Sequence, residues 1–140
     1  MKGSNITTTS WVELCVSDLE QSITWFENVL GFHVTTRDAN EFAALSLGNT
    51  SILLGNQDAP YWEPERSRLP QPGARGSGVE IALLVENVDA IYLQAQLAKA
   101  EIVRELADYP WHMRQFWVRH PDGYLLRPAQ KLISVHQNII

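Results

Sequence analysis

The stretch Trp11-Val-Glu-Leu-Cys-Val-Ser-Asp-Leu-Glu-Gln-Ser-Ile-Thr-Trp-Phe26 predicts a strand that leads directly into a helix. Its first half alternates, which is typical of a strand between two different environments. One face would carry Val12, Leu14 and Val16, and the other face Trp11, Glu13 and Cys15. In the second half Asp18 is a candidate N-cap, and apolar residues recur at helical spacing until Gly31 supplies a stop signal.

The same order of elements returns in the second half of the chain. Residues 79–85 form a second apolar strand, and a helical pattern follows Asn87, a second candidate cap. Further short strands are predicted at 32–36, 42–47 and 51–54, and again at 101–106, 112–119 and 124–129. Because each module has one helix to cover one face of its sheet, the opposite faces are expected to meet around a cavity. The sequence thus predicts an α+β fold in which two βαβββ modules with mixed sheets surround a concave pocket.

The 140 residues are predicted to form a single domain with an irregular middle segment. The expected parts are a first module at about 10–55, a linker at 56–77, a second module at about 78–130 and a C-terminal tail at 131–140. Four prolines in the linker exclude a continuous helix or a central strand. Its arginines, Arg66, Arg68 and Arg75, alternate with acidic residues and are interpreted as part of a solvated loop.

Composition excludes several classes of function. The net charge of -5 argues against nucleic-acid binding, which generally requires a basic face. The chain has no apolar run near the ~20 residues that cross a bilayer, and its start lacks the apolar core of a signal peptide, so a cytoplasmic location is expected. The single cysteine, Cys15, makes an intrachain disulfide impossible and is predicted to be a buried, inert thiol.

Three further segments occur in order and with suitable spacing. They are Val16 to Phe26 followed by Leu30-Gly31-Phe32, then Val85-Glu-Asn-Val-Asp89, and finally Pro110 to Leu126 with its turn His120-Pro-Asp-Gly-Tyr124. Together they resemble the vicinal oxygen chelate superfamily (glyoxalase, bleomycin resistance protein and extradiol dioxygenase), and the bleomycin-resistance-like members above all. The resemblance covers about Trp11 to Gln130. It implies paired βαβββ modules and a homodimer whose pockets form from both chains.

The resemblance also implies where a metal would be bound. Metal-dependent members carry His, Gln or Glu on the first strand of each module and Glu on a last strand. These positions fall on Trp11, Glu80 and Arg127, with Leu54 on the last strand of the first module. Because an indole and a guanidinium offer no useful lone pair to a metal, neither a metal nor another cofactor is predicted. The histidines lack the spacing of a metal cluster and are predicted to be surface or satisfied residues: His33, His112, His120 and His136.

Acids, an arginine and tryptophans remain as the predicted ligand-binding set. Its members are Trp11, Glu13, Trp62, Glu80, Trp111, Trp117 and Arg127. Aromatic faces stack on planar groups or hold cations, and the two acids can complement positive charge. Arg127 can pair with Glu80 or Glu13, so a purely structural ion pair is an alternative interpretation. No catalytic residue is predicted, because neither a Ser-His-Asp nor a Cys-His arrangement is present.

These features favour metal-independent binding of a small planar aromatic molecule with a cationic group. Sequestration of a bleomycin-like antibiotic is the most concrete version, and it would make the chain an antibiotic-resistance protein. One alternative is a lyase, isomerase or dioxygenase-like enzyme of the same superfamily with an atypical site. Another is a sensory or partner-binding module. The expected partners are the small ligand and a second copy of the chain, with no nucleic acid and no membrane.

Overall fold

The first module is a four-stranded mixed sheet in the order β1-β4-β3-β2. Its strands are β1 (Val12–Val16), β2 (His33–Asp38), β3 (Phe42–Leu47) and β4 (Thr50–Asn56). β1 and β4 are parallel, whereas the other pairs are antiparallel. The computed structural model describes residues 6–133, so the prediction for His136 lies outside the described residues.

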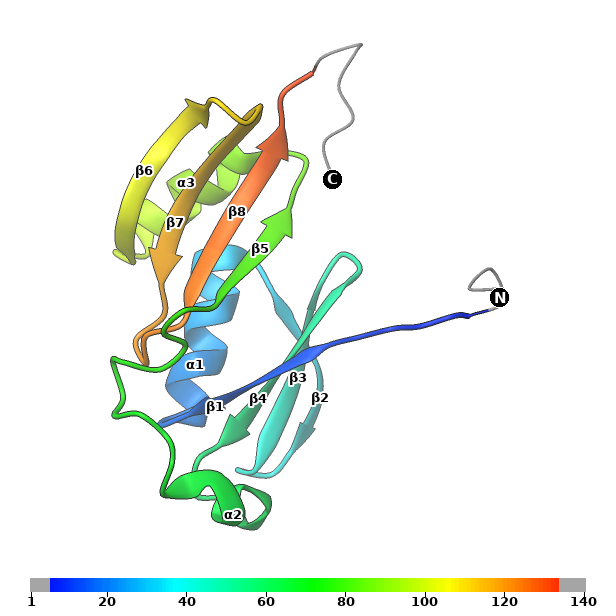
Figure 1. Cartoon of the computed structure of the whole chain (residues 1–140), viewed down its shortest axis with the longest axis vertical. Helices are drawn as coiled ribbons and strands as arrows, with labels where there is room; N and C mark the ends of the chain where they lie inside the picture. Colours follow the sequence, from blue (N-terminus) through cyan, green and yellow to red (C-terminus); the bar gives the residue numbers. More distant parts are fainter. Residues whose placement is uncertain (1–5, 134–140) are drawn as a thin grey trace.

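The second module repeats this arrangement, with the sheet order β5-β8-β7-β6 and a parallel β5–β8 pair. Its elements are β5 (Glu80–Leu84), α3 (Val88–Leu97), β6 (Glu101–Tyr109), β7 (Met113–Arg119) and β8 (Leu125–Lys131). Figure 1 shows the two modules one above the other along the long axis of the molecule. The predicted α+β fold of two βαβββ modules is therefore confirmed.

The caps expected from the sequence form at both helices. The Asp18 side chain accepts a hydrogen bond from Gln21 N at 3.0 Å, and the Asn87 side chain accepts one from Ala90 N at 3.1 Å. The first helix is α1 (Leu19–Trp25), which continues into a π-helical turn, η2 (Phe26–Leu30), before Gly31 ends it at a φ of 83°. The π-helical turn was not predicted; it keeps Phe26, Val29 and Leu30 in the core.

The linker contains a short 3-10 turn, η3 (Pro60–Trp62), and one helical turn, α2 (Glu63–Arg66). The interpretation of Arg75 as a solvated residue was wrong, because its side chain is only 5% exposed. Its guanidinium is satisfied by neutral acceptors: Nε donates to Pro70 O at 3.0 Å and Nη2 to Gln57 Oε1 at 2.7 Å. Nη1 also donates to Cys15 O of β1 at 3.5 Å, so Arg75 ties the linker to the first module.

The hydrophobic core lies between each sheet and its helix. The predicted faces of β1 hold for Leu14 and Val16, which are buried with the helices, and for Glu13 on the opposite, open face, whereas Val12 at the start of the strand is 37% exposed. Cys15 is buried too, and burial raises the pKa of its thiol, as expected of an inert cysteine. None of the helices described between residues 6 and 133 is long and apolar enough to cross a membrane.

The turn between β7 and β8 joins the two modules through buried polar groups. Ser17 donates to Asp122 twice, from N to Oδ2 at 2.7 Å and from Oγ to Oδ1 at 2.6 Å. His120 is almost fully buried; its Nδ1 accepts from Asp122 N at 3.0 Å, and its Nε2 lies 2.9 Å from Ser22 Oγ. Because Nδ1 accepts, Nε2 carries the proton and donates it to Ser22, so this histidine cannot act as the base for that serine. The prediction of a satisfied histidine is confirmed for His120.

Acid should weaken this contact between the two modules, because it protonates His120. Burial lowers the pKa of His120 from 6.5 to about 4, although the charge of Asp122 opposes the shift. The unfolded chain therefore binds more protons between these values, and stability falls as the pH drops through this window. We expect the free energy of unfolding to be about 3 kcal/mol lower at pH 4 than at pH 7 on account of His120.

Urea denaturation at several pH values measures this effect. The control is His120→Gln, whose amide can donate to Ser22 and accept from Asp122 without titrating. Its stability should change less with pH than that of the natural chain, and equal slopes for the two proteins would contradict the assignment.

Candidate functional site

Glu80 and Arg127 form an ion pair on the open face of the second sheet. Arg127 Nε donates to Glu80 Oε2 at 2.6 Å, while Trp117 Nε1 donates to Glu80 Oε1 at 2.9 Å. Although burial opposes ionisation, these two hydrogen bonds and the charge of Arg127 lower the pKa of Glu80. Both oxygens of the carboxylate are thus engaged, and the predicted pairing of Arg127 with Glu80 is confirmed.

Gln115 extends this arrangement toward a second tryptophan. Its Oε1 accepts from Arg127 Nη1 at 2.9 Å and from Trp111 Nε1 at 3.2 Å. Trp111 in turn stacks on Tyr109 at a centroid distance of 5.1 Å. Arg104 lies over the rings of Tyr109 and Trp117, at 4.6 and 5.0 Å. We call these residues the second-sheet cluster: Glu80, Arg104, Tyr109, Trp111, Gln115, Trp117 and Arg127.

A smaller group lies on the open face of the first sheet, over Gly55 of β4. A Cβ placed on Gly55 would lie 2.6 Å from Glu13 Oε2 and from Tyr61 OH, and closer still to Trp62 Nε1. Burial and the Glu13 carboxylate raise the pKa of Tyr61 to about 12, so its hydroxyl stays protonated and donates to Glu41 O at 3.4 Å. Glu13, Tyr61 and Trp62 form the first-sheet cluster.

Three buried side-chain polar atoms in the described part of the chain have no hydrogen-bond partner. They are Glu13 Oε2, Trp62 Nε1 and Gln115 Nε2. All three belong to the two clusters. Since an unsatisfied buried polar group costs about 1–3 kcal/mol, such atoms call for a functional explanation.

The structure does not bring all the predicted ligand-binding residues together. Within residues 6–133, no hydrogen bond or ring contact joins the first-sheet cluster to the second-sheet cluster. Trp11 lies just before β1, which begins at Val12, and its side chain is 62% exposed. One chain therefore holds Glu13 and Trp62 at one place, Glu80, Trp111, Trp117 and Arg127 at another, and Trp11 in neither.

The comparison with known families gives a direct match. The model of the Glyoxalase/Bleomycin resistance protein/Dioxygenase superfamily matches residues 8–127. The chain belongs to this superfamily. The resemblance seen in the sequence motifs is thereby confirmed.

Relatives and solved structures agree with this assignment. Uncharacterized protein YwbC of Bacillus subtilis is 32% identical over 116 residues, which cover 79% of this chain and 86% of that protein. Virulence protein STM3117 of Salmonella typhimurium is 32% identical over 117 residues, 84% of this chain and 79% of that protein. Its crystal structure matches with a TM-score of 0.69 and 27% identity over 91% of this chain and 98% of that chain. The crystal structure of TioX from Micromonospora sp. ML1 matches with a TM-score of 0.69 and 26% identity, over 89% and 100% of the chains.

The residues at the metal-binding positions of this superfamily do not fit a resident metal. Trp11 and Arg127 supply an indole and a guanidinium, and both oxygens of Glu80 already accept hydrogen bonds. Placing Leu54 at the fourth position was wrong, because Leu54 is fully buried in the core. The register pairs Glu13 with Leu53, which therefore faces the open side and has no donor atom. Within residues 6–133, no three His, Cys, Asp or Glu side chains are grouped to hold a metal.

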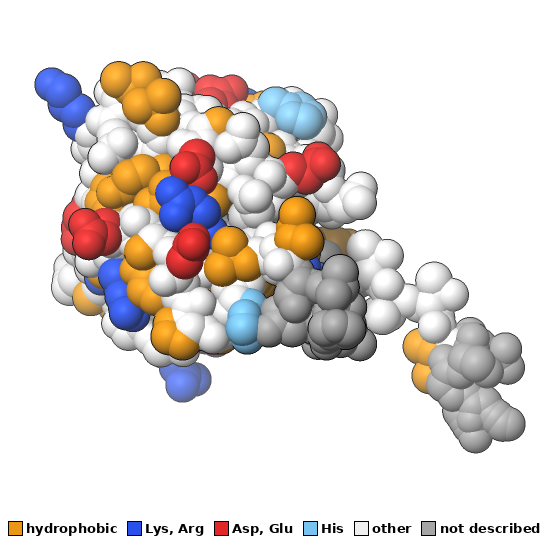
Figure 2. Space-filling view, turned by 90° about the horizontal axis from the view of Figure 1, so that it is seen from above, with side chains coloured by type: hydrophobic (Ala, Val, Ile, Leu, Met, Phe, Trp, Pro, Cys, Tyr) orange, Lys and Arg blue, Asp and Glu red, His pale blue; other side chains and the backbone are white. Residues whose placement is uncertain are grey.

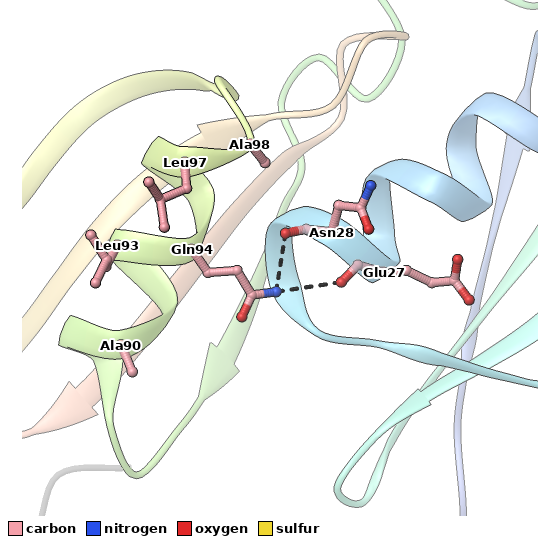
Figure 3. Close-up of a pocket in the computed structure, with 7 residues that line it drawn as sticks. All are labelled: Glu27, Asn28, Ala90, Leu93, Gln94, Leu97 and Ala98. Carbon is pink, nitrogen blue, oxygen red and sulfur yellow. Dashed lines mark hydrogen bonds between the residues drawn. The ribbon is translucent and has the colours of Figure 1, made fainter.

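The surface also has hollows besides the two clusters. A groove of about 500 Å³ lies between η2 and α3. Its lining is drawn in Figure 3, where Gln94 Nε2 donates to Asn28 O at 3.1 Å and to Glu27 O at 3.4 Å. This hydrogen bonding joins the helices of the two modules, and the apolar side chains beside it are Leu93 and Leu97. Another hollow, of about 250 Å³, reaches Glu80 at the edge of the second sheet. The face seen in Figure 2 has separate small groups of hydrophobic side chains among acidic and basic ones.

Sequence reasoning missed four members of the clusters: Tyr61, Arg104, Tyr109 and Gln115. Tyr61 was assigned to the linker, and only its position next to Trp62 pointed to it. Gln115 and Trp117 share one parity on β7, so their common face could have been inferred from alternation. The face on which Arg104 lies could not have been inferred in this way, because register shifts on both sides of it interrupt the pairing of β6 with β7.

Gly55→Ala should disrupt the first-sheet cluster. The added methyl group has no room among Glu13, Tyr61 and Trp62, so we expect a loss of about 1–3 kcal/mol in the free energy of unfolding and a change in Trp62 fluorescence. Ser51→Ala, at an exposed position of the same strand, is the control and should stay within about 0.5 kcal/mol of the natural chain. Equal stability of the two variants would show that the cluster is loosely packed.

Proposed function

We propose that this protein binds a small planar aromatic molecule without a metal. The observation that carries the proposal is the set of three partnerless buried polar atoms, Glu13 Oε2, Trp62 Nε1 and Gln115 Nε2. Each belongs to a cluster that contains tryptophan rings on an open sheet face. A ligand that stacks on these rings can supply an acceptor to Gln115 Nε2, whereas Glu13 Oε2 and Trp62 Nε1 converge with the Tyr61 hydroxyl over Gly55 and can in part satisfy one another.

Glu13 is the acid that can meet a cationic group on the ligand. Glu80 cannot do so readily, because Arg127 and Trp117 occupy both of its oxygens. Glu13 has no ion pair among the described residues, and its Oε2 has no hydrogen-bond partner. A planar cation that stacks on Trp62 and binds Glu13 would be held by both charge and ring contact. Sequestration of a bleomycin-like antibiotic in the cytoplasm is the concrete form of this proposal.

A second copy of the chain would complete the site. β1 and β5 are edge strands of their sheets, and their outer backbone groups are open to pairing. Ala82 and Leu84 of β5 are exposed on the same face as Glu80, and Trp11 is exposed beyond the start of β1. We propose a homodimer in which the first sheet of one copy lies against the second sheet of the other, so that both clusters line one pocket.

Tryptophan fluorescence of metal-stripped protein tests the binding function. Titration with bleomycin and a panel of planar cations should give saturable quenching at micromolar concentrations, and zinc, nickel or manganese should not be required. Trp62→Leu should weaken the binding of a planar cation roughly tenfold, because a stacking surface is lost. Leu97→Ala, at an exposed position on α3, should bind like the natural chain. A response that appears only with metal would favour an enzyme of the same superfamily instead.

Subunit mixing tests the shared pocket. Trp62→Leu damages the first-sheet cluster, and Trp117→Leu damages the second. If each pocket takes one cluster from each chain, the purified heterodimer of the two variants has one intact pocket, while each parent has none. We therefore expect the heterodimer to recover high-affinity binding at about half the stoichiometry of the natural dimer. Heterodimers that bind no better than the parents, or a protein that is monomeric by light scattering, would contradict this arrangement.

A further inference from the structure

We infer that the second-sheet cluster recognises an acidic group, a carboxylate or an ionised phenol, on the planar ligand, and that Arg104 is the residue that binds it. The inference rests on the proposed binding function and adds the charge of the ligand at this end of the pocket. It concerns a residue that lies outside the positions where the superfamily places its metal ligands.

The charges of the second-sheet cluster leave one cation over. Glu80 and Arg127 neutralise each other at 2.6 Å. Arg119, at the other end of β7, is paired with Glu101 at 3.3 Å. Arg104 forms no ion pair with an acidic side chain anywhere in residues 6–133. Within the second-sheet cluster, Arg104 is therefore the one cation without an acidic partner.

A register shift in β6 places Arg104 on this face. Ile102 pairs with Val118, which is fully buried, and Arg104 pairs with Trp117. In a regular strand, residues 102 and 104 would share a face, so the shift between them turns Arg104 away from the core and toward the open side. Cross-strand neighbours on one face are in contact, which explains why the guanidinium lies over the Trp117 ring.

The aromatic rings beneath Arg104 leave its hydrogen-bonding edge available. The guanidinium lies over Tyr109 and Trp117 at 4.6 and 5.0 Å, and ring faces take up positive charge without occupying N–H donors. A carboxylate can accept two parallel hydrogen bonds from such a planar group. A ring system attached to that carboxylate would lie close to the indole of Trp117.

Gln115 adds a donor whose orientation is fixed. Its Oε1 accepts from both Trp111 and Arg127, so the amide cannot turn over without facing two donors with its own NH2 group. Its Nε2 is therefore a donor, and it is one of the buried atoms that lack a partner. Gln115 Nε2 and the Arg104 guanidinium are thus both donors on this face, which suits an acidic group and not an ammonium group.

Matched planar probes test this inference. In titrations followed by tryptophan fluorescence, 2-naphthoate should bind at least about tenfold more tightly than 2-naphthamide, which has the same ring system without the charge. Arg104→Gln should bring the ratio of 2-naphthoate to 2-naphthamide affinity close to one, because the charge that distinguishes the two probes is lost. Arg68→Gln, which removes the same charge from an exposed linker position, should keep the preference and controls for net charge. Thermal melts of both variants check that they are folded.

The outcomes separate this inference from the proposed function. Equal binding of the two probes would overturn the recognition of an acidic group and leave aromatic binding in place. A preference for 2-naphthoate that survives Arg104→Gln would overturn the assignment to Arg104. If neither probe nor any planar cation binds, the proposed function itself fails, and this inference fails with it.

Discussion

The rest of the structure depends on the satisfaction of buried polar groups at the turn between β7 and β8. Asp122 accepts two hydrogen bonds from Ser17, at the point where β1 passes into α1, and His120 bonds to Ser22 one turn further along that helix. These contacts hold the turn before the last strand of the second module against the start of the first helix of the other module. Because these groups are buried, the loss of one hydrogen-bond partner would leave the other group without a partner and without access to water. The geometry of these contacts is therefore narrowly defined.

With the helices packed in the middle, each sheet turns its other face outward. The two open faces carry different chemistry. The first face has the Glu13 carboxylate and the Trp62 indole N–H packed closely over Gly55. The second face has the Arg104 guanidinium over aromatic rings, beside the ion pair of Glu80 and Arg127. A pocket built from both would therefore have an acidic end and a basic end, and would select ligands by the order of their charges as well as by ring size.

Alternation placed Leu14 and Val16 in the core and Glu13 on the open face of β1. The family resemblance placed Glu80 and Arg127 at neighbouring positions, and their 2.6 Å contact confirms the pairing. These predictions failed where the count along a strand was off by one or interrupted. Leu54 was predicted to occupy the open-face position of β4, but the register partner of Glu13 is Leu53, one residue earlier. Arg104 changes face at a bulge that no local sequence signal marks. The burial of Arg75 could not be predicted from the sequence either. Its guanidinium donates to the backbone carbonyl of Pro70 and to the side-chain amide of Gln57, and such neutral acceptors leave no charge pattern in the sequence.

The ion pair between Glu80 and Arg127 also has an evolutionary consequence. In a chain with this pair, replacing Arg127 by glutamate would set two carboxylates side by side with neither a cation nor a metal between them, because Trp11 supplies no ligand. A change of Arg127 to glutamate alone would thus destabilise this face of the second sheet. The ion pair therefore limits which single substitutions this position of β8 can accept.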